Sequence, residues 1–125
     1  MRKDSPRPPS VKRPLHKELV AASSEPLVLS VLSRGESYGY EIIQQIRAFS
    51  DGHIEWTDGM LYPVLHRLER QGLIESEWKI SEAGRKRKYY VLSPQGKLAL
   101  EDKRRQWEAV SATLSQLWEG QPCST

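Results

Sequence analysis

The feature that most constrains this chain is a helix pattern that leads straight into a basic hairpin pattern, between residues 57 and 90. Apolar residues recur at the i, i+3, i+4 and i+7 spacing of one buried helical face, namely Leu61, Val64, Leu65 and Leu68. Gly72 marks the end of this helix, because glycine adopts the left-handed C′ conformation without strain. The pattern predicts a helix with one face for a core and one polar face available for a partner.

A β-hairpin is predicted directly after this helix. Residues 73–80 and 88–92 have strand composition, and residues 81–87 between them supply turn residues and positive charge. Four like charges stand in a row at Arg85, Lys86, Arg87 and Lys88, and phosphate groups would relieve their repulsion. The nearby aromatic residues are Trp78, Tyr89 and Tyr90. We interpret them as mainly structural, because aromatic residues in a hairpin more often pack than stack on bases.

A helix with a free polar face beside a cationic hairpin is typical of a winged helix-turn-helix. The polar face is where we expect a recognition helix to contact DNA. Arg67 and Arg70 have the fork geometry for guanine or phosphate, and His66 can donate to either. Tyr62 and Pro63 can contact thymine methyl groups. The alternative interpretation is the solvated face of an ordinary amphipathic helix.

The segment from Leu15 to Leu32 is predicted to be core scaffold. Its apolar positions suggest one helix or two, because Pro26 is tolerated only in a first turn or at a kink. Ser24 is the candidate cap of the second segment.

Another helix is predicted from Tyr38 to about Phe49, with Ser37 as its N-cap. Its buried stripe consists of Ile42, Ile43, Ile46 and Phe49. Gly39 lies next to that stripe and implies the close approach of another backbone, because a helical glycine costs about 1 kcal/mol. The hydroxyls of Tyr38 and Tyr40, with the amides of the helix N-terminus, are candidates to bind DNA phosphates. Tyr38 could equally close the core.

Residues 50–57 connect this helix to the recognition helix, and Ile54 and Trp56 are expected to re-enter the core. Residues 57 and 58 can cap the recognition helix. Pro63 would remove one backbone bond if that helix began at residue 58, so its start is expected at residue 59 or 60.

A long helix closes the chain. Ser93 and Pro94 form a helix start, and nothing breaks the pattern before about Trp118. Apolar residues repeat at heptad spacings, with Lys103 as the one polar interruption, and they are Leu100, Trp107, Val110, Leu114 and Leu117. A domain this small has no surface left to cover the stripe. We therefore expect it to pack on a second copy, in a homodimer suited to palindromic DNA.

Three separated motifs also resemble one family, the PadR-like transcriptional regulators, in their order and close spacing. They are SYGYEIIQQI, DGMLYPVLHRLERQGLIES and GRKRKYYVLSPQG, and the resemblance covers roughly residues 17–118. It implies a bacterial DNA-binding regulator, usually a repressor, that works as a dimer. Met60 departs from the family pattern, since many members carry a small hydroxyl residue there, and one expected phosphate contact is in doubt. Some relatives bind flat hydrophobic ligands between such helices, which makes Trp107 a candidate ligand contact besides its place in the predicted interface.

Composition narrows the function classes. A chain of 125 residues has room for one domain. Its three histidines are scattered without metal or catalytic spacing, and its single cysteine supports no disulfide framework. We expect no enzyme, cofactor or metal site. No apolar run approaches the roughly 18 residues of a membrane span, and without a secretory signal we expect a cytoplasmic protein. Its formal charge is +3, and its Lys and Arg residues concentrate in the N-terminal arm and the hairpin. This distribution favours nucleic acid as partner.

The expected fold class is mainly α with a small β-hairpin. Residues 1–14 are expected to be a disordered basic arm, which either follows DNA phosphates or acts as a solubilising tail. Residues 15–92 form the winged helix-turn-helix domain, residues 93–118 the dimerisation helix, and residues 119–125 a tail. We expect a homodimeric, sequence-specific DNA-binding repressor of a palindromic operator. The alternative is a winged-helix module that binds protein partners without reading DNA.

Overall fold

The computed structural model describes residues 15–120, so the predicted arm and residues 121–125 lie outside the described part of the chain. The helices α1 (Lys17–Ser33), α2 (Gly39–Phe49) and α3 (Asp58–Arg70) come first, with a short strand β1 (Ser37–Tyr38) before α2. The strands β2 (Ile74–Ile80) and β3 (Lys86–Leu92) and the helix α4 (Pro94–Glu119) follow. The expectation of a mainly helical fold with a small hairpin is confirmed.

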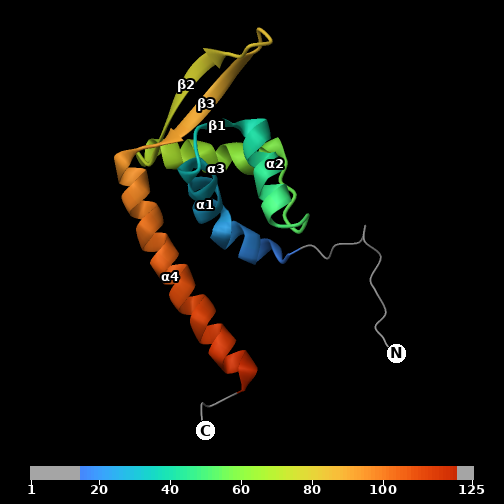
Figure 1. Cartoon of the computed structure of the whole chain (residues 1–125), viewed down its shortest axis with the longest axis vertical. Helices are drawn as coiled ribbons and strands as arrows, with labels where there is room; N and C mark the ends of the chain where they lie inside the picture. Colours follow the sequence, from blue (N-terminus) through green and yellow to red (C-terminus); the bar gives the residue numbers. More distant parts are fainter. Residues whose placement is uncertain (1–14, 121–125) are drawn as a thin grey trace, which may run out of the picture.

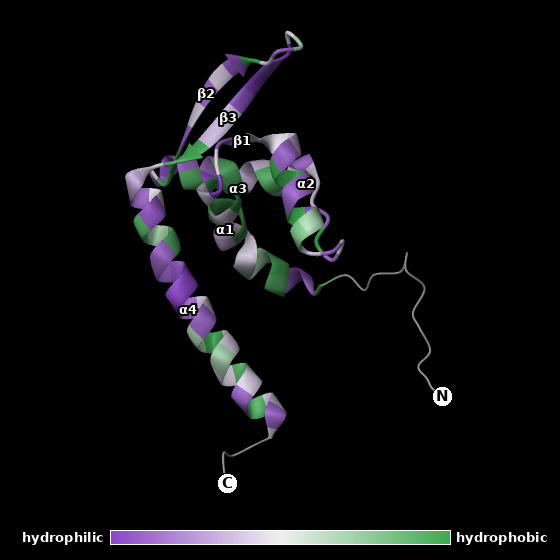
Figure 2. Ribbon diagram, in the orientation of Figure 1, coloured by the Kyte–Doolittle hydropathy of each residue, from purple (hydrophilic) through white to green (hydrophobic). Residues whose placement is uncertain are grey.

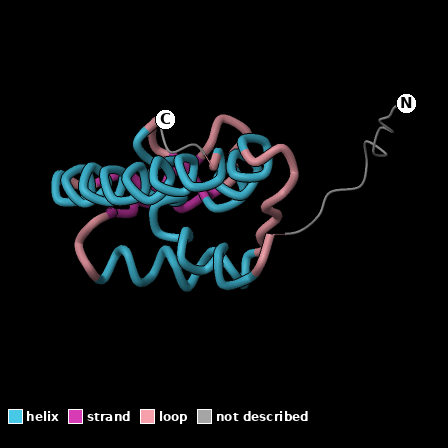
Figure 3. Tube along the Cα trace, turned by 90° about the horizontal axis from the view of Figure 1, so that it is seen from below, coloured by secondary structure: helices cyan, strands magenta, loops and turns pink. Residues whose placement is uncertain are grey.

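The first three helices pack together, and the β2–β3 hairpin projects from one side of them (Figure 1). The sheet is antiparallel, with β3 in the centre of the order β1-β3-β2. Seen from below, the strands lie largely behind the helices (Figure 3). α4 starts next to the hairpin and extends well beyond the packed helices (Figure 1). The hairpin is therefore the wing of a winged helix-turn-helix.

α1 is one continuous helix that contains Pro26. The predicted role of Ser24 as the cap of a second helix is wrong, because its hydroxyl donates to the carbonyl oxygen of Ala21 within the same helix, at 2.9 Å. Val28 and Leu29, beyond the proline, are fully buried. Their burial stabilises the helix across a position where proline removes a backbone hydrogen bond.

The start of α2 differs from the prediction. The helix begins at Gly39 with Tyr38 as its N-cap, and Ser37 is fully buried in β1, opposite Tyr90 of β3. The Ser37 hydroxyl donates to Oε1 of Glu41 at 2.7 Å. Local capping rules assign Ser37 to the N-cap of α2, but Ser37 instead pairs with Tyr90 in the sheet.

The buried face of α2 is shorter than the predicted stripe. Ile42 and Ile46 are buried and Ile43 is partly buried. Phe49 is 69% exposed, and the guanidinium carbon of Arg34 lies 4.8 Å from its ring centroid. A cation, and not the core, is thus the neighbour of a ring that the helical period assigns to the core.

α3 begins at Asp58, earlier than the predicted start at residue 59 or 60, and Pro63 lies inside it. Thr57 is the N-cap but makes no side-chain cap hydrogen bond. The neighbour of Gly39 also differs from the prediction: a Cβ there would overlap the phenol end of Tyr62, a side chain of α3 and not a backbone. Because Gly39 has no Cβ, the Tyr62 ring can pack directly against the backbone of α2.

The core confirms the predicted apolar face of α3. Ile54 and Trp56 are also buried, as expected for the linker. The buried residues of α3 are Leu61, Val64, Leu65 and Leu68. Gly72 has φ +75 and ends the helix as predicted, since the N–H of the next residue, Leu73, donates to the carbonyl oxygen of Leu68 at 3.0 Å.

The junction between the wing and α4 is closely packed. Ser93 is the N-cap of α4, with Pro94 at the first position, as predicted. Its hydroxyl accepts from the N–H of Gly96 at 3.0 Å and donates to the carbonyl oxygen of Gly72 at 2.6 Å. A Cβ at Gly96 would overlap the carbonyl oxygen of Leu73. These contacts tie the start of α4 to the end of α3.

Apolar and polar residues alternate along the part of α4 that extends beyond the other helices (Figure 2). Within residues 15–120, no helix combines the length and the apolar character that a membrane span requires.

Candidate nucleic-acid interface

A groove of about 680 Å³ opens between the start of α2, α3 and the wing. Most of the predicted DNA-binding residues line it. They are Tyr38 and Tyr40 at the start of α2, Tyr62 and His66 on α3, and Arg85, Lys86, Arg87 and Lys88 on the wing. Gly39, Asp58, Trp78 and Tyr90 complete the lining. Four cations thus face a single carboxylate, that of Asp58, and the groove attracts polyanions.

The α2 side of the groove holds one packed and one open tyrosine. The Tyr38 ring packs edge-on against Tyr89, with centroids 5.4 Å apart, and the guanidinium carbon of Arg87 lies 4.2 Å from its centroid. Tyr40 is 65% exposed. The Tyr38 ring is therefore packed and also borders the groove, and its phosphate contact stays a prediction.

On α3, Tyr62 and His66 stand one turn apart on the groove side, with ring centroids 6.4 Å apart. His66 is exposed, whereas Tyr62 is partly buried against the core. Pro63 is exposed but does not line the groove. Met60 lines a different cavity, which it shares with Trp56.

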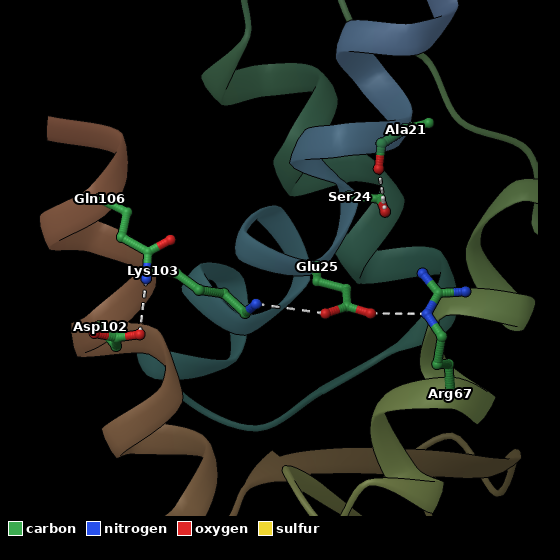
Figure 4. A network of polar contacts seen from close by, with 7 residues as sticks. All are labelled: Ala21, Ser24, Glu25, Arg67, Asp102, Lys103 and Gln106. Carbon is green, nitrogen blue, oxygen red and sulfur yellow. Dashed lines mark hydrogen bonds and ion pairs between the residues drawn. The ribbon is translucent and has the colours of Figure 1, made fainter. Parts of the chain in front are cut away.

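The two arginines of α3 lie outside the groove. Nε of Arg67 donates to Oε2 of Glu25 on α1 at 2.7 Å, and Oε1 of Glu25 lies 3.6 Å from Nζ of Lys103 on α4 (Figure 4). Arg70 is exposed and borders a shallow depression with His66 and Glu69. Sequence spacing places Arg67 on the polar face, but its partner comes from α1.

The wing displays its cations along β3 and the turn. Hydrogen bonds shape that turn: the N–H of Ser81 donates to the carbonyl oxygen of Arg85 at 2.8 Å, and the N–H of Arg85 donates to the Ser81 hydroxyl at 3.1 Å. Lys86 Nζ lies 5.4 Å from the Trp78 ring centroid, and Lys88 Nζ lies 5.7 Å from that of Tyr90. The charges are held close to aromatic rings, which keeps them on the strand surface.

Burial raises the pKa of Tyr90, which is among the residues that line this groove, to about 12. On the other side of the hairpin, the pKa of Lys79 is also raised, through its hydrogen bonds to Glu36. The residues described by the structure contain no cluster of metal-ligating side chains.

The predicted interface residues of α4 are arranged along its free length. Leu100, near the domain, packs partly against the core. The remaining four are exposed to different degrees, Trp107 by 39%, Val110 by 54%, Leu114 by 37% and Leu117 by 70%. Trp107 also borders a small polar depression with Lys103 and Gln106.

Comparison with known proteins shows which family has this arrangement of helices and hairpin. The model of the transcriptional regulator PadR-like family matches residues 28–102, well over half of the chain. This chain belongs to the PadR-like family. The resemblance drawn from the three motifs is confirmed, and members of this family are transcriptional regulators, not enzymes.

Individual PadR-like proteins support the assignment. The transcriptional regulator YqjI of Escherichia coli is 36% identical over 88 residues, which make up 70% of this chain and 41% of that protein. This chain thus corresponds to less than half of YqjI. The crystal structure of a PadR-like transcriptional regulator from Bacillus cereus is 32% identical, with a TM-score of 0.75 over 83% of this chain and 99% of that one. A PadR family regulator from Eggerthella lenta is 34% identical, with a TM-score of 0.68 over 82% and 88%.

Proposed function

We propose that this PadR-like chain is a sequence-specific DNA-binding regulator that places α3 in a major groove and its wing against the adjacent backbone. The observation that carries the proposal is the groove between α3 and the wing, whose lining holds four cations against one carboxylate. Double-stranded DNA supplies the polyanion that relieves the repulsion within residues 85–88. His66 and Tyr62 on the groove side of α3 are the candidate base contacts.

The proposed roles of the two α3 arginines differ from those that spacing suggests. Arg67 positions α3 through its ion pair with Glu25. Arg70 is exposed at the C-terminal end of the same helix, where a guanidinium can bind a backbone phosphate. Met60, Pro63 and Tyr40 remain candidates for contacts at the edges of the interface.

We propose further that two copies associate through α4. The stripe of Trp107, Val110, Leu114 and Leu117 is exposed within one chain, and its heptad spacing is that of a helix that packs on a like helix. A two-fold dimer presents two recognition helices to a palindrome with half-sites about one DNA turn apart. Such a dimer covers its operator, so repression is the proposed outcome.

A small hydrophobic effector is the remaining part of the proposal. Trp107 is partly exposed and lies on the stripe between the two proposed copies, where a flat ligand would contact an indole from each chain. A ligand that changed the separation of the two recognition helices would release the DNA. The alternative use of Trp107 as plain interface packing predicts no ligand.

Charge removal on the wing tests DNA binding against the alternative of a protein-docking module. The double variant Lys86→Ala/Lys88→Ala removes two cations from the groove, and the control Lys97→Ala/Arg105→Ala removes two exposed cations from α4. We expect the wing variant to weaken DNA binding and to reduce the slope of log K against log salt by about 2 for each protomer bound, with the control unchanged. Equal DNA binding by both variants would favour the protein-docking module.

A further inference from the structure

A cavity of about 1030 Å³ is lined by α1, by the linker between α2 and α3, and by α3 itself. We call it the linker cavity. It shares no lining residue with the proposed DNA groove, and Trp107 does not line it. Its volume is about that of the larger small-molecule sites in proteins. Its apolar lining includes Val20 and Ala21 of α1, Ile54 and Trp56 of the linker, and Met60 and Val64 of α3.

The wall of the linker cavity contains a buried hydrogen-bond donor. Trp56 lines the cavity, and only 6% of the residue is exposed. Its Nε1 is buried, and no residue that the structure describes accepts its N–H. An indole nitrogen can only donate, and buried donors in proteins are nearly always paired. A ligand with an acceptor at this wall would remove the cost of the unpaired donor.

The charged side chains around the linker cavity indicate an uncharged ligand. Nε of Arg47 lies 3.1 Å from Oε2 of Glu55, and Nε of Arg67 lies 2.7 Å from Oε2 of Glu25. Lys17 is exposed, so solvent screens its charge. A charged ligand would have to compete with the two ion pairs, whereas an uncharged one leaves them intact.

We propose that the linker cavity binds a small, uncharged, largely apolar molecule whose carbonyl oxygen accepts a hydrogen bond from Nε1 of Trp56. The apolar lining contacts the body of the molecule, and the indole N–H fixes its orientation. Because Nε1 itself is buried, the molecule reaches it by a small movement of the side chains around the indole. The bound molecule also contacts Met60 and Val64 in the first two turns of α3. This site is separate from the one proposed at Trp107 and does not depend on DNA binding.

The experiment titrates the full-length protein with prodan, an uncharged naphthalene ketone whose fluorescence rises and shifts to shorter wavelength in apolar surroundings. A second probe is the analogue of prodan with a methylene group in place of the carbonyl. Trp56→Phe removes the N–H but keeps an aromatic ring. We expect this variant to bind prodan about tenfold more weakly than the wild type, because the carbonyl loses its donor. The methylene analogue should be affected much less, and the difference between the probes isolates the hydrogen bond.

Two further variants and one control locate the bound probe. Ala21 is exposed at the edge of the linker cavity, so Ala21→Phe places a ring in the cavity and should reduce prodan binding at least about tenfold. Ala48→Phe is the control, at an exposed position of α2 outside the cavity lining, and should bind like the wild type. Trp107→Ala should also bind like the wild type. Thermal melts check that each variant is folded.

Three results would overturn the proposal. If the wild type shows no saturable prodan binding, the cavity is closed in solution, for example by a second copy of the chain. If Ala21→Phe retains binding and Trp107→Ala loses it, the probe binds at the α4 stripe. If Trp56→Phe weakens both probes equally, the indole donates no hydrogen bond to the ligand. None of these results bears on DNA binding, which is measured without the probe.

Discussion

Nε of Arg67 on α3 donates a hydrogen bond of 2.7 Å to Oε2 of Glu25 on α1, and the other oxygen of that carboxylate lies 3.6 Å from Nζ of Lys103 on α4. One acidic side chain thus links the proposed recognition helix to the proposed dimerisation helix (Figure 4). Glu25 is largely covered, with 22% of its side chain exposed. The bridge is therefore less screened by solvent than an ion pair on an open surface.

Replacing Glu25 by alanine leaves Arg67 and Lys103 near each other without their shared counter-charge. We expect the free energy of unfolding to fall by about 1 to 2 kcal/mol, measured by urea denaturation. The matched control is Glu108→Ala, which removes the exposed pair with Arg104 on α4 and should cost less than about 0.5 kcal/mol. Equal losses in the two variants would mean that the bridge contributes no more than a surface pair.

Two glycines in helices should respond oppositely to alanine. Gly96→Ala places a Cβ against the backbone carbonyl of Leu73, which already accepts from the N–H of Ser93 at 3.0 Å, so we expect a loss of at least about 2 kcal/mol. Gly59→Ala meets only Thr57 Oγ1 at 3.8 Å and should stabilise α3 by up to about 1 kcal/mol. Denaturation curves for both variants measure the difference. A neutral Gly96→Ala would contradict the close packing of α4 on the end of α3.

Tyr90 should titrate above the ordinary range of a tyrosine. Burial raises its pKa to about 12, from an ordinary value of about 10. Because the unfolded chain loses this proton first, the free energy of unfolding should be unaffected by Tyr90 below about pH 10 and should fall as pH rises from 10 to 12. Absorbance at alkaline pH should show this late titration in the wild type but not in Tyr90→Phe. A single transition near pH 10 in both proteins would contradict the burial of the phenol.

Leu114→Asp should convert the proposed homodimer to a monomer without unfolding the domain. Leu114 is 37% exposed and lies outside the core of the single chain, so an aspartate there is solvated in the monomer but buried without a partner in the dimer. Sedimentation velocity measures the change. Leu98→Asp, at a position that is 74% exposed and off the heptad stripe, is the control and should remain a dimer. A monomeric wild type would rule out the α4 interface.

Local patterns in the sequence were sufficient for the main elements. The spacing from Leu61 to Leu68 predicts the buried face of α3, and Gly72 predicts its end. The Ser93 cap predicts the start of α4. Each of these depends on residues within a few positions of one another, which is the range over which helix periodicity and capping act.

The error at Ser37 arises because its partner lies far along the chain. Ser37 pairs with Tyr90 in the sheet, which no capping rule for α2 can foresee. The ion pair of Arg67 with Glu25 of α1 likewise follows from no local pattern, because its two residues are far apart in the sequence. Trp78 lines the groove with the wing lysines. The alternation of side chains along a strand can assign Trp78 to one face of the hairpin, but which lysines share that face depends on the hairpin register, which the turn sets.

Sequence-specific DNA recognition is tested most directly by selecting bound sequences from a pool of random duplexes. The selected sequence and a scrambled one are then titrated by fluorescence anisotropy. The expected result is an enriched palindrome with half-site centres about one DNA turn apart. That sequence should be preferred over the scrambled duplex by roughly 10³-fold or more. The contradicting result is no enriched sequence, with equal, weak and strongly salt-dependent binding to both duplexes, which is phosphate attraction alone.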